Sequence, residues 1–151
     1  MLIDPLTALD LDAVLTVEQR SFRDPWPRKV FEAELQHEWS YSYILRPAPD
    51  SPPVGHVVFW IVADEVQLLH VAVDPDWRGQ GYGRALLERL LEQARVNEAS
   101  RITLEVRRSN RAALRLYLSL GFQSVGLRPR YYASDGEDAI VMDCVLNDDS
   151  E

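Results

Sequence analysis

The pattern of hydrophobic and polar positions predicts four helices along the chain. In four segments, apolar side chains recur at helical spacing and would share one face. We expect these helices at residues 7–21, from Pro27 to Leu35, at residues 82–96, and from Ser109 or Asn110 to Gly121. Leu9 is expected on the apolar face of the first helix and Asp10 at its N-cap. Pro27 is a tolerated first-turn residue, and Gly121 is a typical C-terminal glycine.

Apolar runs between these helices predict strands. They are YSYILR, the two arms of VGHVVFWIVADEVQLLHVAV around a turn near Asp64 and Glu65, RITLEVR, and two closing stretches at 122–128 and 138–146. With a strand at the start of the chain, the element order is β-α-α-β-β-β-α-β-α-β-β. Two strand-helix-strand crossovers would make the middle of the sheet partly parallel, and the first hairpin would make the rest antiparallel. We therefore expect an α/β fold with one mixed sheet of about seven strands flanked by four helices.

Length and composition fit a single domain. The chain has 151 residues, 46% of them hydrophobic and 26% charged, which is ordinary for a soluble globular protein. We expect residues 1–146 to form the domain and residues 147–151 a frayed acidic tail. The apolar runs are too short to cross a bilayer, and Asp4 and Pro5 interrupt the N-terminus before a signal peptide forms. The lone Cys144 is typical of packed core, so we expect a cytoplasmic protein.

Charge and histidine spacing argue against two classes of partner. The formal net charge is −8, with 24 acidic and 16 basic residues, which disfavours nucleic acid and accommodates a basic protein or peptide. His37, His56 and His70 lack the spacing of metal ligands, so we interpret them as structural and predict no metal.

The stretch VAVDPDWRGQGYGRALLERLLEQ joins an apolar strand to an amphipathic helix through three glycines. Gly79, Gly81 and Gly83 let consecutive N–H groups turn toward one point, and the following helix adds the positive end of its dipole. A turn that only connected the two elements would need one glycine. With Arg78 and Arg84 beside them, the three glycines favour a phosphate-binding site.

Two common phosphate-binding motifs do not fit this loop. A Walker loop is excluded because Gly-Lys-Ser/Thr is absent from the sequence. A dinucleotide fingerprint matches at Gly79 and Gly81, and Glu105 follows at about the right distance. Its third glycine, however, would fall on Arg84, and only two strands remain to complete a doubly wound sheet.

The motif R-x-x-G-x-G at Arg78, Gly81 and Gly83, between the strand LLHVAV and an amphipathic helix, resembles the acetyl-CoA motif of the GCN5-related N-acetyltransferases (GNAT). The predicted element order is also that of this family. Three further stretches, SFRDPWPRKVF, LEVRRSNRAALRLYLSLGF and RYYASDGEDAIVM, resemble its bacterial RimI group, which acetylates the N-terminal alanine of a small-subunit ribosomal protein. The resemblance covers nearly the whole chain and implies direct acetyl transfer from acetyl-CoA to a protein N-terminus in a ternary complex.

The resemblance also implies which residues bind acetyl-CoA. In the family, the strand before the loop splays from its neighbour and holds the pantetheine arm, while N–H groups of the loop hold the pyrophosphate. The cofactor-binding residues implied here are Val71, Ala72, Val73, Arg78, Gly79, Gln80, Gly81, Tyr82, Gly83, Arg84 and Asn110. Asn110 suits a simple helix cap equally well. Gln67 stands where relatives often have Glu, so any role of that carboxylate is missing here.

Two residues are implied in catalysis. Attack of an amine on a thioester needs a neutral amine, a stabilised oxyanion and a protonated leaving thiolate. A protein α-amino group has a pKa of about 8, against about 10.4 for lysine, so it needs only modest help from a base. Glu105 matches the family's proton acceptor, although its pattern also fits a surface strand residue paired with arginine. Tyr117 matches the general acid in N-x-x-A-x-x-x-Y, although its spacing alone is that of a core aromatic.

Four aromatic residues are implied as walls for the peptide. They are Phe22, Trp26, Tyr131 and Tyr132, each of which could instead pack its own loop. The acidic run from Asp135 to Asp138 is expected as solvated loop charge that could also meet a basic peptide. The alternatives to a protein N-terminal acetyltransferase are a GNAT enzyme acting on a small amine or a lysine side chain, and an acyl-CoA-binding domain without turnover. A monomer is favoured.

Overall fold

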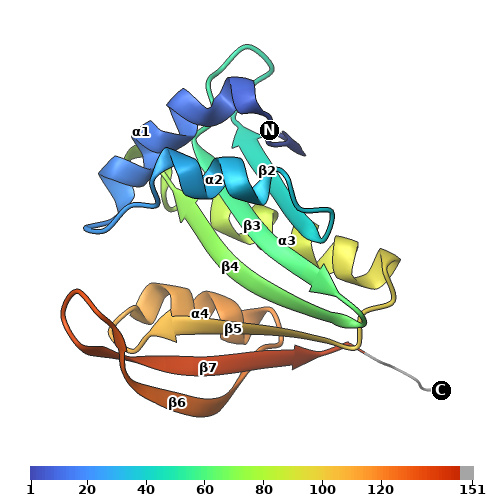
Figure 1. Ribbon diagram of the computed structural model, residues 1–151, viewed down its shortest axis with the longest axis vertical. Helices are drawn as coiled ribbons and strands as arrows, with labels where there is room; N and C mark the ends of the chain where they lie inside the picture. Colours follow the sequence, from blue (N-terminus) through green and yellow to red (C-terminus); the bar gives the residue numbers. More distant parts are fainter. Residues whose placement is uncertain (147–151) are drawn as a thin grey trace.

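The computed structural model describes residues 1–146, in which seven strands form one sheet in the order β1-β2-β3-β4-β5-β7-β6 (Figure 1). The strands are β1 Leu2–Pro5, β2 Ser40–Arg46, β3 Gly55–Val62, β4 Glu65–Val73, β5 Arg101–Arg107, β6 Gln123–Tyr132 and β7 Glu137–Val145. The helices are α1 Leu11–Ser21, α2 Arg28–Glu34, α3 Tyr82–Val96 and α4 Arg111–Ser119, with short 3₁₀ turns η1 Ala8–Asp10 and η2 Pro75–Trp77. The expected mixed sheet with four helices is confirmed.

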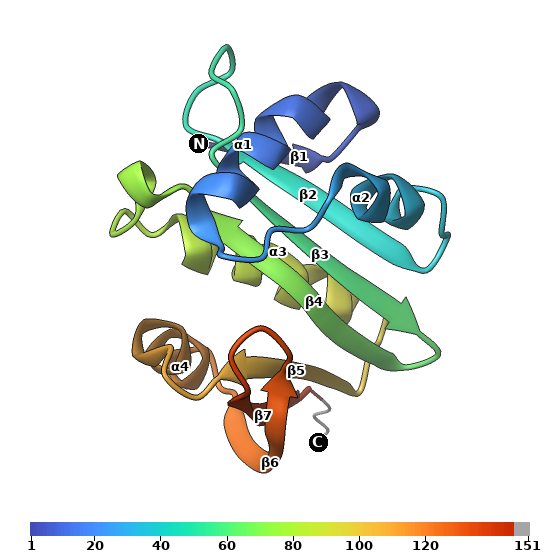
Figure 2. The ribbon, with the colours of Figure 1, turned by 60° about the vertical axis from the view of Figure 1, so that its left-hand side comes forward.

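Helices cover both faces of the sheet and bury a separate apolar cluster on each. On one face, α1 and α2 pack on the first strands around Phe31, Ile44 and Val58 (Figure 2). On the other face, α3 and α4 pack on β3, β4 and β5 through a larger cluster that includes Leu86 and Leu104. The predicted spacing of apolar residues on α3 is confirmed, because its leucines at helical spacing are buried.

The sheet contains one parallel pair rather than two. The β4-α3-β5 crossover makes β4 and β5 parallel, as expected. The second crossover, β5-α4-β6, does not bring its two strands together, because β7 folds back between them. β7 pairs with β5 in antiparallel fashion along seven residues, from Arg101↔Val145 to Arg107↔Ala139. The β6–β7 hairpin at the end of the chain therefore sets the strand order at this edge of the sheet.

Several element ends differ from the sequence pattern. α1 begins at Leu11, and Leu9 lies before it with 96% of its surface exposed, so the prediction that Leu9 belongs to the apolar face was wrong. Asp10 is the N-cap residue of α1, as expected, but its carboxylate accepts the Thr7 N–H at 2.8 Å and makes no hydrogen bond to the helix. The 3₁₀ turn η1 changes the chain direction before α1 begins. The spacing of apolar residues does not predict such a turn.

Three further expectations concern the single cysteine, the C-terminal residues and membrane-spanning segments. Cys144 is a free, buried cysteine, as expected from the apolar run around it. The proposed acidic tail at 147–151 lies outside the described residues. Within residues 1–146, no helix is long and apolar enough to cross a membrane.

Candidate active site

The parallel strands β4 and β5 separate along most of their length. They pair at only three positions, from Glu65↔Arg101 to Gln67↔Thr103. Beyond Gln67, β4 remains paired with β3, with a register shift at Val58/Phe59. Over the same stretch, β5 remains paired with β7. Figures 1 and 2 show the two strands adjacent at one end and apart at the other. A bulge increases the local twist of a strand, which accounts for the separation and leaves facing backbone edges without a strand partner.

The glycine loop lies at the separated end of β4. Gly79 and Gly81 adopt φ values of 78° and 84°, a left-handed conformation that favours glycine. Gly81 is the N-cap of α3, and no side chain caps this end of the helix. The first N–H groups of a 15-residue helix therefore face outward with the positive end of the dipole. Gly83 differs, because it lies in the first turn, where a Cβ would meet Leu116 at an ordinary 3.6 Å.

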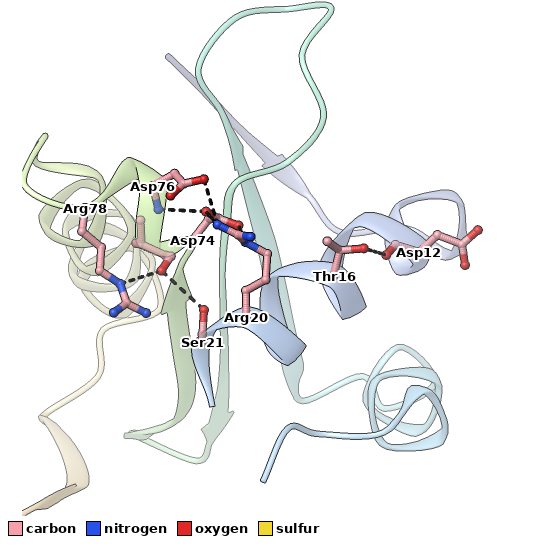
Figure 3. Close-up of polar contacts among 8 residues, drawn as sticks. Asp12, Thr16, Arg20, Ser21, Asp74, Asp76 and Arg78 are labelled. Atoms are coloured by element: carbon pink, nitrogen blue, oxygen red, sulfur yellow. Dashed lines mark hydrogen bonds and ion pairs between the residues drawn. The ribbon is translucent and has the colours of Figure 1, made fainter. Parts of the chain in front are cut away.

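The start of the loop is fastened to α1 (Figure 3). Arg20 at the end of α1 donates to Asp74 at 2.9 Å and to Asp76 at 2.8 Å. Asp74 also accepts the N–H of Asp76 at 2.9 Å, which fixes η2. Burial opposes ionisation of Asp74, but the hydrogen bonds from Arg20 and Asp76 outweigh burial and hold its pKa below the ordinary value. The loop is thus braced by an ionised, mostly buried carboxylate.

One backbone carbonyl of the expected pantetheine-binding stretch already accepts hydrogen bonds from side chains of the protein. The Val73 carbonyl accepts from Arg78 Nε at 2.9 Å and, at the limit of hydrogen bonding, from Ser21 Oγ at 3.5 Å (Figure 3). Val71 and Ala72 precede this carbonyl on the separated part of β4. Arg84, expected beside the phosphates, donates to Ser119 of α4 at 2.5 Å. Asn110 caps α4, accepting the Ala113 N–H at 3.1 Å.

Glu105 lies on the side of β5 opposite its buried residues. Ile102, Leu104 and Val106 are buried against α3 and α4, whereas Glu105 points to the other face, as the alternation predicts. Its side chain is 16% exposed and lies 3.4 Å from Arg128 Nε of β6. The arginine pairing expected of a surface strand residue is therefore present, but on a carboxylate with little contact with solvent.

Tyr117 is buried in the larger apolar cluster with 5% of its surface exposed. Burial raises its pKa well above the ordinary value, and the nearby Tyr132 adds to the effect, so the phenol stays protonated at neutral pH. Burial also raises the pKa of Tyr132 to about 12, with the Arg107 charge opposing and the charge of nearby Glu105 adding.

The acidic run after β6 is paired with arginine while Asp135 stays exposed to solvent. Arg107 Nη1 donates to Asp135 at 2.9 Å and to Glu137 at 3.1 Å, and its guanidinium lies 4.1 Å from the centre of the Tyr132 ring. Glu137 also accepts the Ser109 N–H at 2.7 Å. Asp135 is exposed, as expected of a loop charge, but both carboxylates also fasten the β6–β7 turn to β5 through Arg107. Tyr131 remains exposed beside Tyr132.

The other two aromatic residues meet a histidine on β4. Trp26 stacks on His70 with ring centres 4.2 Å apart, and Phe22 lies 4.8 Å from the same ring. His70 directly precedes the expected pantetheine stretch. The loop between α1 and α2 therefore packs against β4 at the point where the cofactor is expected.

Sequence spacing missed a buried polar cluster behind this loop. Glu18 of α1 lies 2.6 Å from Nε2 of both His56 on β3 and His70 on β4. The potential ligand atoms of these three residues all lie within 4.8 Å of one another. The signal in the sequence was the hairpin register, which pairs His56 with Ala72 and His70 with Val58 and so places both histidines on one face. Nothing in the sequence ties Glu18 to that face.

The chain matches known acetyltransferases over most of its length. Residues 11–122 match the family model described as Acetyltransferase (GNAT) family. A curated ribosomal protein bS18-alanine N-acetyltransferase from Escherichia coli strain K12 is 41% identical over 142 residues, which cover 93% of this chain and 94% of that protein.

Solved structures agree with this match. The crystal structure of the Escherichia coli ribosomal-protein-S18-alanine N-acetyltransferase superimposes with a TM-score of 0.89 at 37% identity, covering 99% of this chain and 96% of that one. Arabidopsis thaliana NAA60 in complex with acetyl-CoA shares the fold, with a TM-score of 0.83 at 18% identity, covering 97% of this chain and 99% of that one. The present chain belongs to the acetyltransferase (GNAT) family, and acetyl-CoA is its acetyl donor.

Proposed function

We propose that this chain acetylates the N-terminal α-amino group of a protein, with the N-terminal alanine of ribosomal protein bS18 as its substrate. The separation of β4 and β5 carries the proposal, because it opens backbone edges between the glycine loop and Glu105. The relative with this substrate aligns with 93% of the chain. We propose further that residues 1–146 are one N-acetyltransferase domain that works as a cytoplasmic monomer.

We propose that acetyl-CoA binds mainly to backbone groups of the glycine loop and of β4. The N–H groups from Gly79 to Arg84 would bind the pyrophosphate, because the two left-handed glycines turn them outward at the N-terminus of α3. The separated edge of β4, from Val71 to Val73, would bind the pantetheine arm. Arg78 holds the Val73 carbonyl at 2.9 Å, so a ligand that uses this carbonyl must displace that side chain.

In the reaction we propose, the substrate nitrogen attacks the thioester carbon and the carbon–sulfur bond breaks. Glu105, directly or through water, takes the proton that the amine loses, and its largely buried position on the face of β5 away from the apolar cluster suits this role. Tyr117 gives its hydroxyl proton to the departing thiolate. Because burial keeps the phenol protonated, that proton is available when negative charge develops on sulfur.

The peptide N-terminus would enter between two aromatic-bearing loops. Phe22 and Trp26 come from the α1–α2 loop, and Tyr131 and Tyr132 come from the end of β6. The carboxylates of Asp135 and Glu137 beside the second wall are paired with Arg107 and do not form a row of free negative charges. Specificity in this proposal therefore rests on shape and on contacts with the peptide backbone and first side chain.

The test uses two peptides with acetyl-CoA, followed by mass spectrometry. One peptide carries the bS18 N-terminus with a free alanine, and the other is the same peptide with a blocked N-terminus and an internal lysine. We expect one added acetyl group on the first peptide alone. Acetylation of the blocked peptide would move the substrate to lysine. Absence of transfer to either peptide, with acetyl-CoA binding demonstrated by calorimetry, would favour a small amine or a domain without turnover.

A further inference from the structure

The carboxylate of Glu18 joins four separate elements of the fold. One oxygen, Oε2, lies 2.6 Å from Nε2 of His56 on β3 and 2.6 Å from Nε2 of His70 on β4. The other oxygen, Oε1, accepts the backbone N–H of Trp26 at 2.9 Å. Because Glu18 itself belongs to α1, this single side chain connects α1, both strands of the hairpin and the loop that follows α1.

Charge makes these contacts strong. Glu18 and His56 are completely buried, and the His70 side chain is 12% exposed. Burial opposes ionisation of Glu18, but the hydrogen bonds from His56 and His70 outweigh it and lower its pKa to about 2. Burial lowers the pKa of His56, so it is the neutral imidazole that donates to the carboxylate. Hydrogen bonds to an ionised acceptor are about twice as strong as neutral ones.

The geometry favours hydrogen bonds over a bound metal ion. Zinc ligands lie about 2.1 Å from the metal, which places tetrahedral ligand atoms about 3.4 Å apart. Here the histidine nitrogens lie 2.6 Å from the shared carboxylate oxygen, too close for an ion between them. A metal on Nε2 would also put a proton on Nδ1 of His56, which is buried without a partner among the described residues.

We propose that Glu18, His56 and His70 are positioning residues for the peptide substrate, because they fix the loop of residues 22–27 over the separated end of β4. This inference rests on the proposed function. Trp26 of this loop stacks on His70, with ring centres 4.2 Å apart and planes 16° apart, and its ring centre also lies 5.3 Å from that of Phe31 in α2. Removing the carboxylate or the His70 donor should free the loop and weaken peptide binding, without touching the cofactor or the proton transfers.

The experiment compares His70→Leu with His70→Gln. Glutamine can donate an N–H from about the same distance as Nε2, whereas leucine cannot donate, and neither side chain stacks as imidazole does. We expect His70→Leu to raise KM for the peptide about tenfold, the cost of one charge-assisted hydrogen bond, with kcat and KM for acetyl-CoA within about twofold of the wild type. His70→Gln should recover most of the lost peptide affinity.

Deuterium exchange provides a second measurement that does not depend on activity. We expect faster exchange across residues 22–27 in His70→Leu and in Glu18→Gln, and near wild-type exchange in His70→Gln. His37 stacks on Trp39 at 4.6 Å outside the site, so His37→Leu is the matched control and should change neither exchange in this loop nor KM.

Four outcomes would overturn the inference. They are unchanged loop exchange in both Glu18→Gln and His70→Leu, equal peptide KM for the leucine and glutamine variants, a fall in kcat alone, and a stoichiometric metal ion that purifies with the wild type and is lost in Glu18→Gln. If no peptide is acetylated, the proposed function fails, but the exchange result still decides whether the cluster positions the loop.

Discussion

The proposed cofactor side and the proposed peptide side of the site are built in different ways. The cofactor side is a continuous stretch of backbone, from β4 through the glycine loop into α3, and its chemistry resides in N–H groups. The peptide side is built from side chains of α1, β3, β4, β5 and the β6–β7 hairpin, held by ionised carboxylates such as Glu18 and Glu137. The two sides should therefore respond differently to substitution: the first to backbone conformation, and the second to the loss of individual charges.

The largest effect should come from the two residues that we propose to transfer protons, Glu105 and Tyr117. Glu105→Gln and Tyr117→Phe should each lower kcat by about 10²-fold to 10⁴-fold, because each removes one proton transfer while leaving the cofactor seat intact. Steady-state kinetics with the alanine peptide from about pH 6 to pH 9 measures this, together with calorimetry for acetyl-CoA affinity. Wild-type turnover by both variants would remove these residues from the mechanism.

The second effect tests the backbone side. Gly81→Val puts a β-branched residue at a φ of 84°, which costs about 1–3 kcal/mol and should tilt the N-terminus of α3. We expect acetyl-CoA affinity to fall by about tenfold to a hundredfold. Gly83→Ala is the comparison, because its Cβ meets only ordinary contacts and the residue is already helical. An equal loss in both variants would mean that space beside the ligand, not backbone conformation, makes these glycines necessary.

The same contrast explains what the sequence could predict. The glycine loop and the strand and helix beside it were located correctly, because their signals are local: positive φ needs glycine, and apolar spacing marks α3. The position of β7 between β5 and β6 was missed, since either strand of the hairpin could have paired with β5.

The peptide side could be predicted only as far as its individual residues. Phe22, Trp26 and Tyr132 are present in the sequence, but their partners His70 and Arg107 lie between 25 and 48 positions away. Local spacing carries no information about such pairings. His70 was accordingly interpreted as structural, although it lies at the centre of the aromatic contacts in this loop.

A smaller effect should appear where α1 braces the glycine loop. Asp74→Asn removes the ionised acceptor of Arg20 and should lower the free energy of unfolding by about 1–2 kcal/mol, with a several-fold loss of acetyl-CoA affinity. Asp76→Asn is the control, because the Asp76 side chain is 77% exposed and its pairing should contribute little. Urea unfolding and calorimetry measure the two quantities. A loss of stability without any loss of affinity would show that the brace serves the fold alone.

The smallest effect concerns acid and the buried histidine. The pKa of His56 is lowered in the folded state, so the unfolded chain binds its proton more readily. Its contribution to stability is therefore complete above about pH 6.5 and declines as the pH falls below that value, by at most about 1.4 kcal/mol per pH unit. His56→Gln can still donate to Glu18 but does not titrate, so its urea-unfolding free energy should fall less between about pH 7.5 and pH 5.5 than that of the wild type. Equal declines would mean that groups other than His56 govern the acid sensitivity of the fold.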